Sequence, residues 1–235
     1  MPLPSDRRTG DSGEDPSPAP VMPDSSRTYL PAAGHDRALA LYDPLLRLLG
    51  ADRSRRLLIE QADLRRGDRV LEIGCGTGTL LIDAGRVAPV ALTGLDPDPR
   101  ALGRARRKAA AAGLSVHLDR GFADALPYRD ASFDRVFSCF MFHHLDGVDE
   151  KRQTLREVRR VLKPDGRFQL LDFVHGSETH RGALRWLHAG HDVRDTTETR
   201  VLALMREAGL RNAVCLRRGT MSFLFRLGYF QAAAA

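Results

Sequence analysis

The chain has 235 residues, a length that suits one domain of ordinary size with a single substantial core. Its formal net charge is +6, but only three of its 36 basic residues are lysines and the arginines are interspersed with acids, which indicates an arginine-biased composition more than a nucleic-acid surface. Three widely spaced cysteines predict neither a disulfide framework nor a zinc site and favour a reducing, cytoplasmic setting. No apolar run of about 18 residues is present that could span a membrane.

The first part of the chain divides into a leader and a helical region. Residues 1–26 carry six prolines among Ser, Asp and Gly, with hardly an apolar side chain, which predicts a disordered leader. From Tyr29 to Ala62, apolar residues recur at helical spacing, which predicts two helices. We therefore expect one domain over residues 27–235 that begins with a helical cap.

The next stretch, Arg69 to Leu80, is typical of a strand, a tight loop and a helix. Its apolar run ends in three alternating glycines, which are Gly74, Gly76 and Gly78. Glycines in such a turn allow positive φ and remove the Cβ atoms that would hold a ligand off the backbone, while the helix start leaves N–H groups available. Glu72 precedes the first glycine, and a carboxylate there would repel a pyrophosphate and favour a cationic ligand.

A second strand, VALTGLD, ends at Asp96. A carboxylate at this point can accept hydrogen bonds from both hydroxyls of a ribose, because the loops beyond the strand ends of a doubly wound sheet meet in one crevice. The same arrangement would serve a dinucleotide, but the fingerprint G-x-G-x-x-G would need glycine where this chain has Thr79. Pro97 then opens a predicted helix over residues 100–112.

The remaining elements predict a largely parallel sheet. Strands are expected over residues 115–118, 133–139 and 167–174, with a helix over residues 149–162 that ends at Lys163–Gly166. The periodicity breaks over residues 175–195, which we expect to form a lid. A last helix over residues 199–208 precedes two runs, 212–216 and 221–225, with a turn at residues 217–220.

The order Glu-x-Gly-x-Gly-x-Gly, followed by Asp96 and the string LREVRRVLKPDG, resembles class I S-adenosylmethionine-dependent methyltransferases of the ubiquinone/menaquinone-biosynthesis type. The resemblance implies an α/β fold with a Rossmann-like, doubly wound, mostly parallel seven-stranded sheet and an antiparallel C-terminal hairpin strand. It also implies S-adenosyl-L-methionine as cofactor. The positions that it places against this cofactor are Glu72, Gly74, Gly76, Gly78, Asp96, Pro97, Ser138 and, on the N-terminal helix, Tyr42.

One position departs from the family pattern. The family often has a Gly-Asp-Ala loop after the third strand, whose Asp bonds the adenine amino group, and here Phe122 stands at that position. Asp124 follows two residues later, where this role is less usual. We expect adenine to stack on Phe122 and to bond main-chain groups near Ala123.

The chemistry implied by the resemblance needs a positioned nucleophile and exclusion of water, so a base is optional. The residues expected to face the methyl group are His143, His144, Asp172 and His175, and a histidine suits proton removal near neutrality. The alternative for the histidine pair is that one of them only fixes the cofactor loop. The histidines of the expected lid lack a companion carboxylate cluster, so no metal site is expected.

Apolar and aromatic residues dominate the expected walls of the crevice, among them Phe140, Met141, Phe142 and Trp186. They favour a hydrophobic small-molecule acceptor, aromatic or quinone-like, methylated on oxygen or carbon, with nitrogen left open. An RNA-modifying methyltransferase and a non-catalytic cofactor-binding module are the alternatives. Against nucleic-acid modification, the fourth strand ends in Ser138-Cys139-Phe140-Met141 and not in the Asn/Asp-Pro-Pro-Tyr/Phe string of amino-methylating DNA enzymes.

Overall fold

The computed structural model describes residues 48–174, 197–222 and 225–234. The expected leader over residues 1–26, the helix expected to carry Tyr42 and the expected lid over residues 175–195 lie outside these ranges. The elements in chain order are α2 (Ala51–Ala62), β1 (Arg69–Ile73), α3 (Thr79–Val87), β2 (Ala91–Asp96), α4 (Pro99–Ala111), β3 (Val116–Arg120), β4 (Phe133–Cys139), η1 (Phe142–His144), α5 (Gly147–Val161), β5 (Leu162–Phe173), α6 (Glu198–Glu207), β6 (Arg211–Met221) and β7 (Phe225–Ala233).

The described strands form one sheet in the order β3-β2-β1-β4-β5-β7-β6. The first five strands in this order are parallel, and β7 runs antiparallel to both β5 and β6. The strand order reverses between β1 and β4, so the loops that leave the carboxyl ends of these two strands diverge and leave room for a ligand. The predicted fold class is confirmed.

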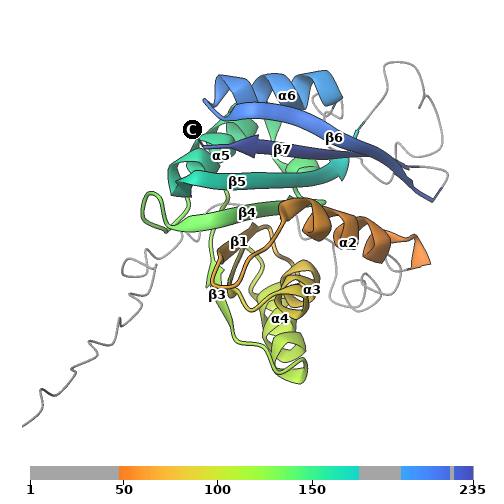
Figure 1. Ribbon diagram of the computed structural model, residues 1–235, viewed down its shortest axis with the longest axis vertical. Coiled ribbons are helices and arrows are strands. Elements are labelled where there is room, and N and C mark those ends of the chain that lie inside the picture. Colours follow the sequence, from red (N-terminus) through yellow and green to blue (C-terminus); the bar gives the residue numbers. More distant parts are fainter. Residues whose placement is uncertain (1–47, 175–196, 223–224, 235) are drawn as a thin grey trace, which may run out of the picture.

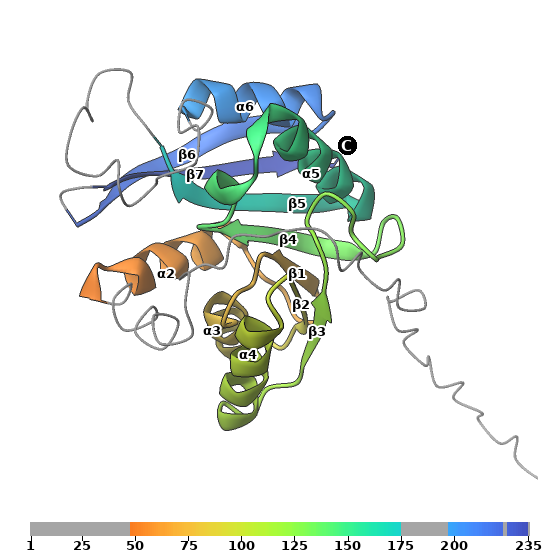
Figure 2. The same cartoon turned by 180° about the vertical axis from the view of Figure 1, so that it is seen from behind.

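Helices cover both faces of the sheet. Figures 1 and 2 show α2, α3 and α4 on one face and α5 and α6 on the other. Because strand side chains alternate between faces, Val70 and Leu92 belong to the core beneath α2, α3 and α4, whereas Leu71 and Leu95 belong to the core beneath α5 and α6. Burial on both faces explains why the interior strands are almost continuously apolar.

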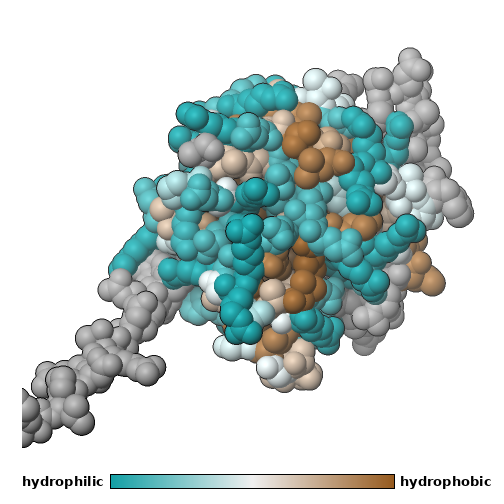
Figure 3. Space-filling model, viewed as in Figure 1, coloured by the Kyte–Doolittle hydropathy of each residue, from teal (hydrophilic) through white to brown (hydrophobic). Residues whose placement is uncertain are grey.

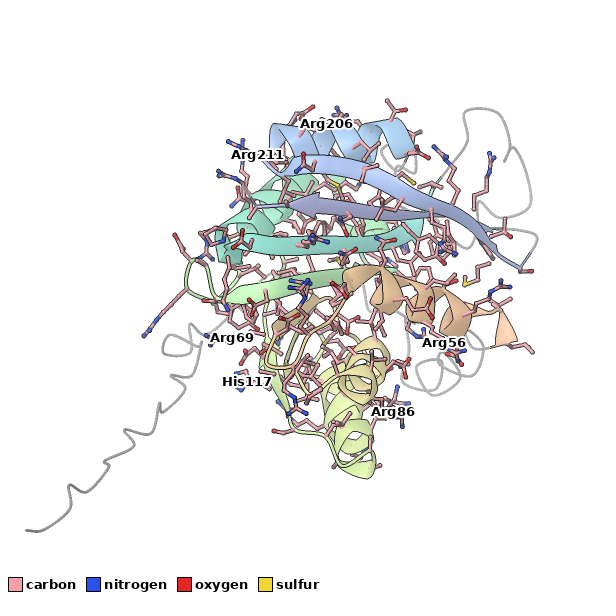
Figure 4. All side chains as sticks on the ribbon, in the orientation of Figure 1. Arg56, Arg69, Arg86, His117, Arg206 and Arg211 are labelled. Carbon is pink, nitrogen blue, oxygen red and sulfur yellow. The ribbon has the colours of Figure 1, made fainter. Side chains whose placement is uncertain are left out.

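Charged residues are distributed over the surface. The face seen in Figure 3 is largely hydrophilic, with apolar residues in separate patches. The arginines labelled in Figure 4 come from five different elements and are spread over the molecule, in keeping with a compositional bias. In the described ranges, no helix combines the length and the apolar character needed to cross a membrane.

The C-terminal hairpin differs from the prediction. The turn expected at residues 217–220 lies inside β6, which runs from Arg211 to Met221. The pairing of β6 with β7 shifts register twice along its length, so β6 accommodates extra residues as bulges and Gly219 pairs with Leu227 as a strand residue. Residues 217–220 are polar, which is typical of a turn, but a strand at the edge of a sheet also exposes charged side chains.

The predicted helix ends agree with the structure, but the start of the fifth strand differs. The helix expected to stop before Lys163–Gly166 ends at Val161, and Lys163–Gly166 already belong to β5, where the pairing passes from Phe133 opposite Leu162 to Arg135 opposite Arg167 and leaves a bulge between. The helix expected over residues 100–112 is α4, which spans Pro99–Ala111. Its N-cap is Asp98, whose side chain accepts a hydrogen bond from the N–H of Arg100 at 2.9 Å.

Arg135 of β4 attaches the end of α2 to the sheet. Its guanidinium group is buried and donates from Nε to the carbonyl oxygen of Ala62 at 2.9 Å and from Nη2 to that of Asp63 at 3.3 Å. The carboxylate of Asp68 lies 3.8 Å from Nη2. Since the last carbonyls of a helix have no partner within the helix, Arg135 satisfies groups that would otherwise be left without one.

We expect Arg135→Met to lower the free energy of unfolding by about 2–3 kcal/mol, because buried carbonyls would lose charged donors while the volume is kept. Denaturant unfolding followed by circular dichroism measures this. The control is Arg56→Met, which changes an exposed arginine of α2 (Figure 4) and should shift the free energy of unfolding by less than about 0.5 kcal/mol. Equal losses in the two variants would contradict the assigned role.

Candidate active site

The glycine loop between β1 and α3 lies at the carboxyl end of the sheet. Gly74, Gly76 and Gly78 all have positive φ, and the N–H of Cys75 donates to the carbonyl of Leu95 in β2 at 3.0 Å. A Cβ atom on Gly74 would overlap with the side chain of Met141, and one on Gly78 would lie 3.0 Å from Ala105 Cβ. A Cβ atom on Gly76 would meet nothing within 4 Å.

Gly74 and Gly78 thus also allow close packing within the protein, whereas Gly76 borders open space. That all three glycines make room for a ligand stays a prediction.

Asp96 joins three loops at the end of β2. Its Oδ2 accepts the N–H of Gly76 at 2.8 Å, its Oδ1 accepts the N–H of Asp98 at 2.9 Å, and its main-chain oxygen accepts the N–H of Gly121 at 3.3 Å. Burial raises the pKa of Asp96 to about 6, against the lowering effect of the two N–H groups on its carboxylate. Each carboxylate oxygen retains a lone pair that a further donor could use.

Glu72 of β1 is a buried carboxyl group, 3% exposed. Burial raises its pKa well above the usual range, nearby Asp96 adds to this effect, and the charges of Arg55 and Lys108 oppose it. Its Oε2 atom has no hydrogen-bond partner in the described part of the chain. A donor from a ligand would remove the cost of leaving this oxygen unsatisfied.

Ser138 supplies a second buried atom of this kind. It is fully buried near the end of β4, in register with Ile73 of β1, and its hydroxyl also lacks a hydrogen-bond partner within the described ranges. Two unsatisfied oxygens thus lie near the carboxyl ends of the two strands between which the strand order reverses.

Lys108 of α4 supports the glycine loop from behind. Its Nζ donates to Thr79 Oγ1 at 2.6 Å and to Thr77 Oγ1 at 3.1 Å, which ties the start of α3 to α4. The sequence alone does not indicate this role, because nothing in a surface helix rich in arginine marks one lysine as inward-facing. Its only distinction is to be one of three lysines in the chain.

The segment after β3 begins with a tight turn. The N–H of Ala125 donates to the carbonyl of Phe122 at 3.2 Å, and Ala123 is buried while Phe122 and Asp124 are partly exposed. Because Gly121 is bonded to Asp96, this turn lies beside the end of β2. The residues expected to contact adenine and ribose are therefore neighbours.

The histidine pair lies in η1, directly after β4. His143 Nδ1 is 2.6 Å from Asp172 Oδ1, and the main-chain N–H of His143 donates to Asp172 Oδ2 at 3.0 Å. Both residues are buried. The ring of His144 lies against that of His143, with centroids 4.0 Å apart and the planes tilted by 38°, and Phe173 meets His143 edge-on at 5.0 Å.

The backbone before η1 is strained. Phe140 has φ of 55°, although it is not glycine, and its ring stacks on Phe173 at 5.1 Å. This turn directs the chain from β4 into η1 and brings His143 to Asp172, 29 residues further along the chain. Over residues 48–174, 197–222 and 225–234, no group of three or more His, Cys, Asp or Glu side chains is suited to holding a metal ion.

Comparison with known proteins identifies the family. Residues 70–166 match a family model described as a methyltransferase domain. A Bacillus subtilis (strain 168) protein described as "Putative methyltransferase YrhH" is 31% identical over 139 residues, which are 57% of this chain and 74% of that protein. The chain belongs to the class I S-adenosylmethionine-dependent methyltransferases.

Other relatives indicate the branch of the family that this methyltransferase resembles. A demethylmenaquinone methyltransferase of Deinococcus radiodurans is 40% identical over 154 residues, covering 64% of this chain and 63% of the relative. A 27-O-demethylrifamycin SV methyltransferase of Amycolatopsis mediterranei is 38% identical over 113 residues, covering 47% of this chain and 40% of the relative. The match therefore spans less than two thirds of the length of either relative.

Solved structures agree with the fold. The YcgJ protein of Bacillus subtilis superposes with a TM-score of 0.66 at 22% identity, over 77% of this chain and 98% of that one.

S-Adenosylmethionine is the cofactor of this enzyme family, and the donor set of the methyltransferase fits it. Glu72 could accept from the ammonium group, Asp96 could accept from the ribose hydroxyls, and Gly76 leaves space for the ligand.

We expect Gly76→Ala to weaken binding of S-adenosylhomocysteine at least about tenfold, because its methyl group would occupy the open space beside the loop. Isothermal titration calorimetry measures the affinity. The matched control is Gly113→Ala, since Gly113 also has positive φ and no atom within 4 Å of a built Cβ but follows α4 away from the loop. Both variants should lose about 1 kcal/mol of unfolding free energy to backbone strain, and only the first should lose affinity.

We expect the affinity for S-adenosylhomocysteine to fall as the pH is lowered through about 6, the pKa of Asp96 in the free protein. Hydroxyl donors favour the ionised carboxylate, so a proton on Asp96 competes with binding. Calorimetry between about pH 5 and 8 measures the effect. Asp96→Asn should bind more weakly at neutral pH by about 1.5–3 kcal/mol and should show a smaller pH dependence. An unchanged pH dependence in this variant would exclude Asp96 as its source.

Proposed function

We propose that this methyltransferase transfers a methyl group from S-adenosylmethionine to an oxygen or carbon atom of a lipophilic, aromatic or quinone-like small molecule. Support for the acceptor class comes from the relatives, one described as acting on demethylmenaquinone and one on an oxygen of a rifamycin. Support for a base-assisted transfer comes from the buried pair formed by His143 and Asp172. This pair is the observation on which the proposal depends.

The pairing determines which nitrogen of His143 can take a proton. The carboxylate oxygen 2.6 Å from Nδ1 accepts a hydrogen bond, so the proton is assigned to Nδ1 and the lone pair to Nε2. Nε2 can then accept a proton from a hydroxyl group or an acidic C–H of the acceptor, while Asp172 stabilises the imidazolium ion. Bound S-adenosylmethionine supplies an electrophilic methyl group on a sulfonium.

His143 and His144 therefore have different roles in this proposal, although the sequence analysis treats them as equal candidates. His143 is oriented twice by Asp172, through its ring and through its main-chain N–H. His144 packs on the His143 ring and keeps it in place.

The remaining positions would bind the cofactor. Glu72 would bind the ammonium group and Asp96, with Pro97 beside it, the ribose. The turn at Phe122 and Ala123 would hold adenine, with Asp124 at its rim. Ser138 would offer its unsatisfied hydroxyl from β4, Gly74, Gly76 and Gly78 would shape the loop, and Tyr42 would cover the cofactor from the N-terminal helix.

We expect His143→Ala to lower kcat about 10²–10⁴-fold with the Kd for S-adenosylhomocysteine nearly unchanged, because a general base is lost. Asp172→Asn should also lower kcat strongly, since an amide can hold the ring in the wrong tautomer. His144→Ala is the matched comparison: it removes only the packing against the His143 ring and should lower kcat far less than His143→Ala does. A full-rate His143→Ala enzyme would leave positioning alone to explain catalysis.

The acceptor class is tested by a screen with a radiolabelled methyl donor against hydroquinones, phenols, macrocyclic polyketides, lipid amines and structured RNA. We expect label in the hydroquinone, phenol or polyketide fractions. Transfer into RNA alone would replace the proposed acceptor. Binding of S-adenosylhomocysteine without transfer to any of these classes would favour a non-catalytic module.

A further inference from the structure

The connection between β3 and β4 crosses part of the sheet without a helix. Residues 121–132 contain no helix or strand, yet Ala123, Leu126 and Tyr128 are buried in the core on the α5 side. A long connection without regular structure in a compact domain is usually functional and must be held by other elements. Its beginning is tied to Asp96 through the N–H of Gly121.

Arg160 of α5 holds the later part of this connection with three of its five N–H donors, and the other two bond Glu157 on the same helix. Nη1 donates to the carbonyl of Tyr128 at 2.7 Å and to Asp130 Oδ1 at 2.8 Å. Nη2 donates to the carbonyl of Leu126 at 3.0 Å and to Glu157 Oε2 at 2.7 Å, and Nε donates to Glu157 Oε1 at 2.8 Å. The five N–H groups of the guanidinium are thus all used.

Glu157 completes the arrangement one turn earlier on α5. Its Oε2 accepts the main-chain N–H of Leu126 at 2.8 Å, in addition to its two bonds with Arg160. Both main-chain groups of Leu126 are therefore bonded to the same side-chain pair. Leu126 directly follows the turn from Phe122 to Ala125, so this turn is held at Gly121 by Asp96 and at Leu126 by the pair.

We infer that Glu157 and Arg160 are positioning residues that set the affinity for the nucleobase of the cofactor, by holding the turn at Phe122 and Ala123 at a defined place relative to Asp96. This inference rests on the proposed roles of that turn and of Asp96. Neither side chain contacts the base. They act through the main chain of Leu126, and the planar fork of arginine is needed because it serves carbonyl and carboxylate acceptors in one plane.

If Arg160 and Glu157 only stabilised α5, their mutation would not weaken binding of the nucleobase in particular. Arg152, on the same helix, also bonds two acids, Asp149 and Glu207, and these bonds do not reach the connection after β3. It is therefore the matched control for loss of an arginine with two ion pairs. Arg160→Lys keeps the positive charge but not the fork.

The experiment compares two ligands in calorimetry. S-Adenosylhomocysteine carries adenine, and S-ribosylhomocysteine has the same amino acid and a ribose without the base. For Arg160→Gln and Arg160→Lys we expect the Kd of S-adenosylhomocysteine to rise about tenfold and that of S-ribosylhomocysteine to change less than about twofold. Arg152→Gln should change neither affinity.

An equal loss of affinity for both ligands would show that the pair only stabilises the domain, and an unchanged Kd for S-adenosylhomocysteine would also overturn the inference. If Arg160→Gln does not fold, as judged by its thermal unfolding, Glu157→Gln gives the same comparison, because it keeps an acceptor for Leu126 and loses the charge. A wild-type chain that binds neither ligand would instead contradict the proposed function.

Discussion

The candidate site depends on the hydrogen bonds that Asp96 accepts at the end of β2. Its two carboxylate oxygens accept main-chain N–H groups from the glycine loop and from the start of the α4 region, and its own carbonyl accepts the first N–H of the connection after β3. Three segments that leave three different strands, β1, β2 and β3, are thus joined at one residue. The same bonds keep the carboxylate oriented in a buried place, where burial raises its pKa to about 6. A site built in this way is organised before a ligand arrives, which lowers the entropic cost of binding.

The alternation of side chains along the strands places the carboxylate of Glu72 and the carboxylate of Asp172 on opposite faces of the sheet. Glu72 lies on the face covered by α2, α3 and α4, in phase with Val70, whereas Asp172 lies on the face covered by α5 and α6, in phase with Leu170. The groups suited to an ammonium ion and a ribose therefore come from one face, and the histidine pair comes from the other. They approach one another only at the carboxyl edge, where the strands end. This placement keeps a basic imidazole away from the carboxylates that would bind the cofactor.

Long cationic side chains of α4, β4 and α5 hold loops and a helix end in place. Lys108 bonds two threonines of the glycine loop, Arg135 bonds the last carbonyls of α2, and Arg160 bonds the connection after β3. Each holds groups whose own secondary structure leaves them without partners. Loops at a sheet edge have many such groups, so an arginine with five donors can hold several at once.

Local patterns allowed much of the fold and of the cofactor loop to be predicted from the sequence. Apolar runs, glycine turns and helix caps act over a few residues, so the strand ending at Ile73, the glycine loop and the carboxylates at positions 72 and 96 could all be placed. The same patterns failed at residues 217–220, because an edge strand is as polar as a turn and its pairing with β7 is not local. Tertiary structure alone decided which histidine meets Asp172, which glycine borders open space, and that Lys108 and Arg160 face inward. These outcomes depend on how parallel strands and their crossovers bring residues about 30 positions apart to one edge, and a periodicity within a single element carries no information on that distance.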